Sequence, residues 1–265
     1  DNEALLELGY IRLRRFADYM GALEIANSGL EATPDDGNLY LLRGLSSVWI
    51  YWYSKEEGDE MATSAAYANT VADYQKAVDL LPANETEALA QLAWLYGDGG
   101  EAVKAVDSAI EIVDRQEDPN FDLLYNLAKS YSIGRQFEAS SKALEKMVSI
   151  SAREISTRLK QEEDVDYVAT ELAWSVGPFV ARQDQATARA ILKAILAADP
   201  KSPEVWHNYA IMCEDTRRFE DALTAYEKSV ELDPENARFY NDLGSLLHHN
   251  LNRDLDRAKE LYETC

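Results

Sequence analysis

The fold of this chain is decided by one stretch of 34 residues, PEVWHNYAIMCEDTRRFEDALTAYEKSVELDPEN, which runs from Pro203 to Asn236. Its first half carries packing residues at three- and four-residue steps: Trp206, Tyr209, Ala210 and Cys213. This spacing predicts one face of a helix, and the second half repeats it around Ala222 and Tyr226. The polar run at 215–218 predicts a tight turn between the two helices, and Pro234 ends the second one. The stretch therefore predicts a helix-turn-helix unit, in which the small residues Ala210 and Ala222 let the two helices cross closely.

The same ending of a helix in proline occurs at four places: LEATP at 30–34, VDLLP at 78–82, LAADP at 196–200 and VELDP at 230–234. The opening helices agree, with packing positions at Leu8-Gly9, 92–96, 127–131 and Leu243-Gly244. Together these patterns resemble the tetratricopeptide repeat, whose units are antiparallel helix pairs. The resemblance implies an all-α fold, a right-handed superhelical solenoid of such pairs. Arg43, which precedes Gly44 in the second unit, stands where the family has leucine.

The repeat period divides residues 1–265 into about seven units of a single solenoid, the last of them incomplete. We expect the units at 2–36, 37–85 with an insertion, 86–120, 121–168 with a lengthened helix, 169–202, 203–236 and 237–265. The seventh unit ends inside its second helix, at Cys265, and the chain begins at Asp1 without an initiator methionine. We therefore expect the chain to be a fragment of a longer protein. A cytoplasmic location fits the composition, and periplasmic or secreted locations stay open.

Two irregular spacings interrupt the repeat pattern. Pro34 and Pro82 are 48 residues apart, 14 more than one repeat, and the excess falls around the aromatic run at 49–53. The second excess lies between the fourth and fifth units, where Ile150 to Glu163 continues a helical pattern. We therefore expect a lengthened helix at 150–163 and an inserted segment near residues 57–68.

The charge of the chain limits the classes of partner. With 48 acidic and 26 basic residues the formal net charge is −22, which disfavours nucleic acid and anionic membranes and favours a protein or peptide partner of basic character. Solubility alone is the alternative explanation. No apolar run is long enough for membrane insertion.

The sequence contains no set of residues typical of an enzyme. Phosphate-binding, zinc-protease, serine-hydrolase and paired-cysteine motifs are absent, so we expect no catalytic residues, no cofactor and no metal. Adjacent His248 and His249 point about 100° apart on a helix and do not face one ion together. The glycines at 97–100 predict a turn between helices, and Asn84 predicts a cap or loop residue.

Family resemblance places the candidate binding residues on the first helices, which line a concave groove in these solenoids. Carried over position by position, they are Tyr125, Asn126, Lys129, His207, Asn208, Arg238 and Asn241. An asparagine amide both donates and accepts hydrogen bonds, so Asn126 and Asn208 suit the backbone of an extended peptide. The Lys and Asn set that clamps a terminal carboxylate in some relatives is incomplete here.

The aromatic insertion offers a second candidate surface. If the helix runs on, Trp49, Trp52 and Tyr53 share one side while Ile50 and Tyr51 face elsewhere, and aromatic side chains often anchor interfaces. We expect a partner or self-association through this segment, with packing inside the chain as the alternative. The function that follows is a non-catalytic interaction scaffold. A helical arm of a larger enzyme, or a transporter-associated solenoid or lipoprotein binding a small ligand, remains open.

Overall fold

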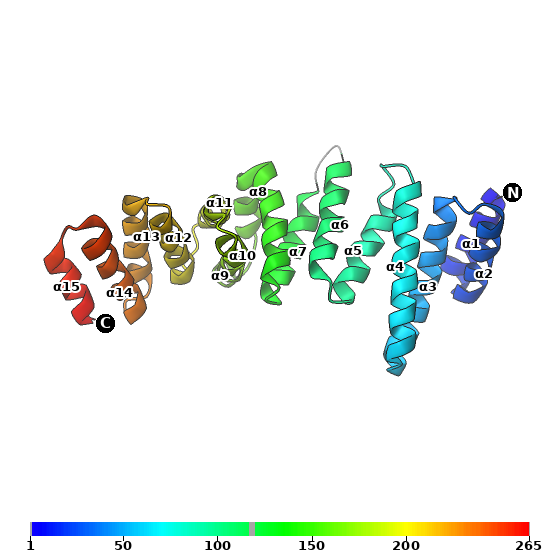
Figure 1. The fold of residues 1–265 in the computed structure, drawn as a ribbon, viewed down its shortest axis with the longest axis horizontal. Coiled ribbons are helices and arrows are strands. Elements are labelled where there is room, and N and C mark those ends of the chain that lie inside the picture. Colours follow the sequence, from blue (N-terminus) through cyan, green and yellow to red (C-terminus); the bar gives the residue numbers. More distant parts are fainter. Residues whose placement is uncertain (1, 117–119, 265) are drawn as a thin grey trace. The chain divides into compact units, whose positions relative to one another are not determined.

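A computed structural model describes residues 2–116 and 120–264, and the ordered elements in these ranges are helices. They group into two compact units, residues 1–119 and 120–265, which are treated separately below. Figure 1 shows the helices of each unit as successive antiparallel pairs. In its described residues each unit is an all-α array of antiparallel helix pairs, as the repeat spacing predicts.

The first unit contains three helix pairs. They are α1 (Asn2–Phe16) with α2 (Tyr19–Ala32), α3 (Gly37–Glu57) with α4 (Glu60–Leu80), and α5 (Glu87–Asp98) with α6 (Ala102–Arg115). The side chains of Asp18, Asp36 and Asp59 accept backbone N–H bonds at the starts of α2, α3 and α4. These caps explain why the helices begin directly after each aspartate.

The second unit begins with α7 (Phe121–Ile133) and α8 (Phe137–Leu159), followed by α9 (Val165–Trp174), α10 (Gly177–Ala181) and α11 (Gln185–Leu196). It continues with α12 (Pro203–Asp215), α13 (Phe219–Leu232), α14 (Ala237–Ser245), a π-helical turn η1 (Leu246–Leu251) and α15 (Leu255–Thr264). Ala210 and Ala222 are fully buried in one core cluster with Tyr226 and Leu243, which confirms the close helix crossing predicted from the sequence.

The insertion near residue 50 lengthens both helices of the second pair. Each of α3 and α4 is 21 residues long, and they turn at Gly58, whose φ of 75° lies in the left-handed region. The expected inserted segment at 57–68 is therefore mostly the first part of α4. In Figure 1 α4 extends past the neighbouring helices of its unit.

Arg43 departs from the family pattern for a visible reason. Its guanidinium hydrogen-bonds to the carboxylate of Asp73 on α4, with Nη2 2.6 Å from Oδ1, and to the amide oxygen of Asn27 on α2 at 3.3 Å. Three helices thus share one polar contact. The hydrogen bond that Arg43 donates to Asp73 also raises the pKa of Arg43, which keeps the guanidinium charged.

The structure changes two expectations for the second unit. The lengthened helix predicted at 150–163 is interrupted, because Ser151 is extended inside α8 with φ −163° and its hydroxyl caps the N–H of Glu154; the helix then ends at Leu159. The fifth pair does not begin at Ala169, since Asp164 caps a helix that starts at Val165. The short α10 then separates this helix from α11.

Candidate binding surfaces

One hollow of the first unit is lined mainly by the first helices of its pairs. It encloses about 790 Å³ between α1, α3 and α5, with Tyr19 at the start of α2. Trp49 and Trp52 reach it from α3, and Trp94 reaches it from α5. Because Trp49 and Trp52 are three residues apart, they fall on the same side of α3. We call this feature the aromatic hollow.

Ring contacts in the aromatic hollow form two pairs. Tyr19 and Trp49 are stacked, with ring centroids 4.4 Å apart and planes 19° apart. Trp52 and Trp94 are tilted by 46°, with centroids 5.3 Å apart. Trp49 is 39% exposed and Trp94 is 44% exposed, so apolar ring surface faces solvent. Aromatic side chains held by their neighbours lose little freedom on binding and are typical anchors of interfaces.

The charged side chains at or beside the aromatic hollow form pairs of opposite charge. Arg14 of α1 is 3.6 Å from Glu87 of α5, and both line the hollow. The ammonium of Lys55 lies 5.2 Å from the centre of the Trp52 ring and donates to Asp98 at 2.6 Å. Burial raises the pKa of Asp98, but hydrogen bonds from Lys55 and Tyr51 outweigh it and hold this pKa below its usual value.

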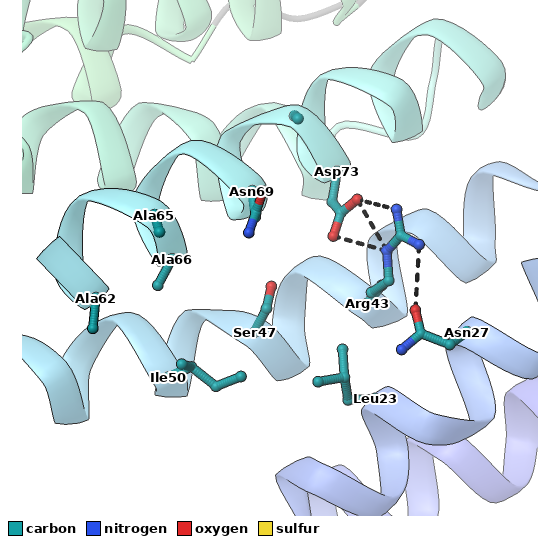
Figure 2. A pocket seen from close by; sticks show the side chains of 11 residues that line it. Leu23, Asn27, Arg43, Ser47, Ile50, Ala62, Ala65, Ala66, Asn69 and Asp73 are labelled. Atoms are coloured by element: carbon teal, nitrogen blue, oxygen red, sulfur yellow. Dashed lines mark hydrogen bonds and ion pairs between the residues drawn. The ribbon is translucent and has the colours of Figure 1, made fainter.

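A second hollow of about 590 Å³ lies on another face of the first unit, between α2, α3 and α4. Figure 2 shows its polar end, where Arg43 bridges Asp73 and Asn27. The other end is formed by alanines of α4, including Ala62 and Ala66, opposite Ile50. Ile50 thus points away from Trp49 and Trp52, as the helical spacing predicts.

The expected surface at 49–53 is divided among three environments. Trp49 and Trp52 line the aromatic hollow, whereas Tyr53 is exposed outside it and Tyr51 is buried. Nothing in the repeat pattern indicates Tyr19, and the pattern places Trp94 among the packing residues, although Trp94 is exposed and Leu95 beside it is fully buried. Counting helical turns from Leu92 and Leu95 could have identified Trp94 as an outward residue.

In the fourth pair two of the predicted residues are bonded inside the protein and one is exposed. The hydroxyl of Tyr125 and the ammonium of Lys129 both hydrogen-bond to Glu162, which follows α8. Both hydrogen bonds lower the pKa of Glu162, and the bond from Lys129 has the larger effect. Asn126 is exposed on α7, and its amide remains available to a ligand. Tyr125 is buried, so its hydroxyl serves this internal network.

Two of the predicted residues of the sixth and seventh pairs, His207 and Arg238, are bonded to carboxylates of the neighbouring helix. His207 is 1% exposed, lies between the rings of Tyr226 and Phe239, and shares a hydrogen bond of 2.8 Å with Asp242. Arg238 donates to both carboxylate oxygens of Glu204. His207 is therefore inaccessible to a partner.

The two asparagines of these pairs remain nearer the surface. Asn208 is half-buried and Asn241 is exposed, with its amide donating to Asp242 at 3.1 Å. The rings of His248 and His249 stack in η1 at 4.1 Å, and no group of three potential metal ligands occurs among residues 2–116 and 120–264. In the same ranges, no helix has both the length and the apolar character needed to cross a bilayer.

Comparison with known proteins bears on the second unit. Residues 218–250, from the turn before α13 into η1, match the family model described as the TPR repeat. This segment of the chain is therefore similar to a tetratricopeptide repeat. It contains the second helix of one pair and the first helix of the next, in the register set by Pro234.

One relative and several solved structures are similar to longer parts of this chain. The pre-mRNA-splicing factor syf1 homolog of Drosophila melanogaster is 27% identical over 143 residues, which cover 49% of this chain and 16% of that protein. The match thus spans a small part of that relative's length. MamA AMB-1 is 15% identical with a TM-score of 0.45, covering 68% of this chain and 88% of that one. MamA 41-end from Desulfovibrio magneticus RS-1 is 14% identical with a TM-score of 0.41, covering 67% and 91%.

Proposed function

We propose that this interaction scaffold holds an extended segment of a protein partner in the aromatic hollow of its first unit. The observation that carries the proposal is the presence of two aromatic pairs, with Trp49 and Trp94 partly exposed, on a hollow lined by first helices. The repeat resemblance independently favours first helices as the ligand-binding elements. The hollow's volume of about 790 Å³ is in the range of pockets that enclose a ligand.

The proposal shifts the main binding site from the second unit to the first. Tyr125, Lys129, His207 and Arg238 are engaged in internal bonds, which leaves Asn126, Asn208 and Asn241 as the accessible polar residues there. These three asparagines define a secondary candidate surface. Asn126 and Asn208 would support the backbone of an extended partner if the second unit also binds.

Affinity capture from the native cell extract with the 265-residue chain tests the choice between the two surfaces. The variants are Trp94→Ala, the double variant Asn126→Ala/Asn208→Ala, and Trp174→Ala as a matched control. Trp174 is 38% exposed on α9, close to the 44% of Trp94, but lies in the second unit. We expect Trp94→Ala alone to lose the partner.

The pattern of losses decides between three explanations. Partner loss only in the asparagine double variant would move the site to the second unit. If all variants capture the partner equally and their circular dichroism is unchanged, neither surface is the binding site, and the chain would instead act as a spacer arm. Trp94 is preferred to Trp52 because Trp52 is half-buried, so its removal would also disturb packing.

A further inference from the structure

We propose that the segment bound in the aromatic hollow is proline-rich and adopts the polyproline II conformation. This inference rests on the proposed function and specifies the chemistry of the ligand. Its basis is the match between the hydrogen-bonding groups of the hollow and those that different peptide conformations expose.

The tryptophans that line the hollow have indole N–H donors without a protein acceptor. Among the residues that the structure describes, the indole N–H of Trp206 donates to the carbonyl of Pro200 at 3.2 Å, whereas the indoles of Trp49, Trp52 and Trp94, and that of Trp174 outside the hollow, make no such bond. An indole nitrogen is a donor only. Three of the side chains that line the hollow therefore carry an indole N–H that no protein group accepts.

A polyproline II helix supplies the complementary groups. It has no internal hydrogen bonds, so its carbonyl oxygens stay free as acceptors, and each proline lacks an N–H. The pyrrolidine rings provide flat apolar faces that stack on Trp and Tyr. The conformation is also formed before binding, so less ordering entropy is lost.

Other peptide conformations match the hollow less well. An α-helical ligand has its backbone carbonyls engaged internally and would leave the three indole donors without backbone partners. A β-strand ligand carries as many N–H donors as acceptors. The side-chain acceptors of the hollow are few, because Glu87 already faces Arg14 and Gln91 offers one amide oxygen.

The charge distribution fits an uncharged binding core in the ligand. Residues 1–119 contain 23 acidic and 8 basic residues, yet the charged residues that line the hollow are Arg14 and Glu87, which pair with each other. The hollow therefore selects by shape and by donor chemistry. The acidic surroundings disfavour acidic residues on either side of the bound prolines.

Indole resonances provide a direct test with the full chain. The protein is labelled with ¹⁵N-tryptophan, which gives five indole signals, and these are assigned with single Trp→Phe variants. The probe is acetylated, amidated decaproline. We expect saturable shifts of the signals of Trp49, Trp52 and Trp94 and none of those of Trp174 and Trp206.

Two comparison peptides separate the ligand class from general peptide binding. A flexible Gly-Ser decapeptide and an Ala-Gln peptide of about 20 residues, long enough to form a helix, both uncharged, should bind at least about tenfold more weakly than decaproline. Trp94→Phe keeps a ring but removes the donor, and we expect affinity for decaproline to fall about two- to tenfold, as for one lost hydrogen bond. Trp94→Ala should reduce it further, and Trp174→Phe should leave it unchanged.

The outcomes separate this inference from the function on which it rests. If the Gly-Ser or Ala-Gln peptide shifts the three indole signals as strongly as decaproline, the proline-rich ligand is wrong and the hollow stays a peptide site. If decaproline shifts none of them and Trp94→Ala still captures the partner, both proposals are wrong. If decaproline shifts none but Trp94→Ala loses the partner, only the ligand class is wrong.

Discussion

At the residue scale, the ion pair between Arg43 and Asp73 shows how one departure from a repeat pattern acquires a structural role. The side chain of Asp73 is only 8% exposed, and Arg43 is its charged partner. A buried carboxylate that loses its partner is strongly destabilising, whereas replacing both members by apolar residues restores packing.

We therefore predict that Arg43→Leu, which installs the family's typical residue, lowers the free energy of unfolding by about 3 kcal/mol. The double variant Arg43→Leu/Asp73→Leu should recover most of this loss. Urea unfolding followed by circular dichroism measures both. A single variant as stable as the unmodified chain would show that the pair has no structural role.

His207 gives a second prediction at this scale. Burial lowers its pKa below the ordinary histidine value of 6.5, against the opposing effect of the hydrogen bond to Asp242. Arg238 also lowers this pKa, and Glu204 raises it. Because the unfolded chain then binds a proton more readily than the folded one, stability falls as the pH drops below about 6.5.

Replacing His207 by Gln removes that proton-binding group. We expect the unfolding free energy of His207→Gln to change less between pH 7 and 5 than that of the unmodified chain, although the variant is less stable at pH 7. Urea titrations at several pH values provide the comparison. Parallel pH profiles would mean that His207 titrates alike in both states.

At the scale of the helix, the sequence predicted the small residues at helix crossings and the prolines after helices. Both features are set by the repeat spacing within a single helix pair. The four prolines at 34, 82, 200 and 234 follow α2, α4, α11 and α13 directly or within a short turn. The break at Ser151 and the π-helical turn η1 were not predictable, since they depend on packing between helices. In the same way, the Trp52 contact with Trp94 joins helices that a single-helix pattern cannot relate.

The crossing of α3 and α4 can be tested at Gly44. A Cβ atom added there would lie 2.5 Å from the ring of Tyr74, which is fully buried. We predict that Gly44→Ala lowers the unfolding free energy by about 1–3 kcal/mol through overpacking. Gly177→Ala is the control, since its Cβ would meet no atom within 4 Å. Equal thermal midpoints of these two variants would contradict the predicted overpacking at Gly44.

At the scale of the whole molecule, net charge governs which flanking residues a ligand can carry. The excess of acidic over basic residues is larger in residues 1–119 than in residues 120–265, which contain 25 acidic and 18 basic residues. The sequence predicted the sign of this field, but not the pairing of Arg14 with Glu87, because these residues lie 73 positions apart.

We predict that adding two lysines to each end of decaproline strengthens its binding to the chain at low salt. The gain should disappear at about 1 M NaCl, where the screening length is about 3 Å. Fluorescence anisotropy of labelled peptides at increasing NaCl measures this effect. If a glutamate-flanked peptide binds as well as the lysine-flanked one, the predicted electrostatic contribution to binding is wrong.

The central claim, that a partner is held in the aromatic hollow of the first unit, is tested most directly by photo-crosslinking. A benzoylphenylalanine is placed at Gln91 inside the hollow in one variant, and at the exposed Asn126 of α7 in another. Both variants are irradiated in native cell extract, and the products are identified by mass spectrometry. The account predicts a partner crosslinked at position 91 through a proline-containing segment; a partner crosslinked at position 126 and absent at position 91 would contradict it.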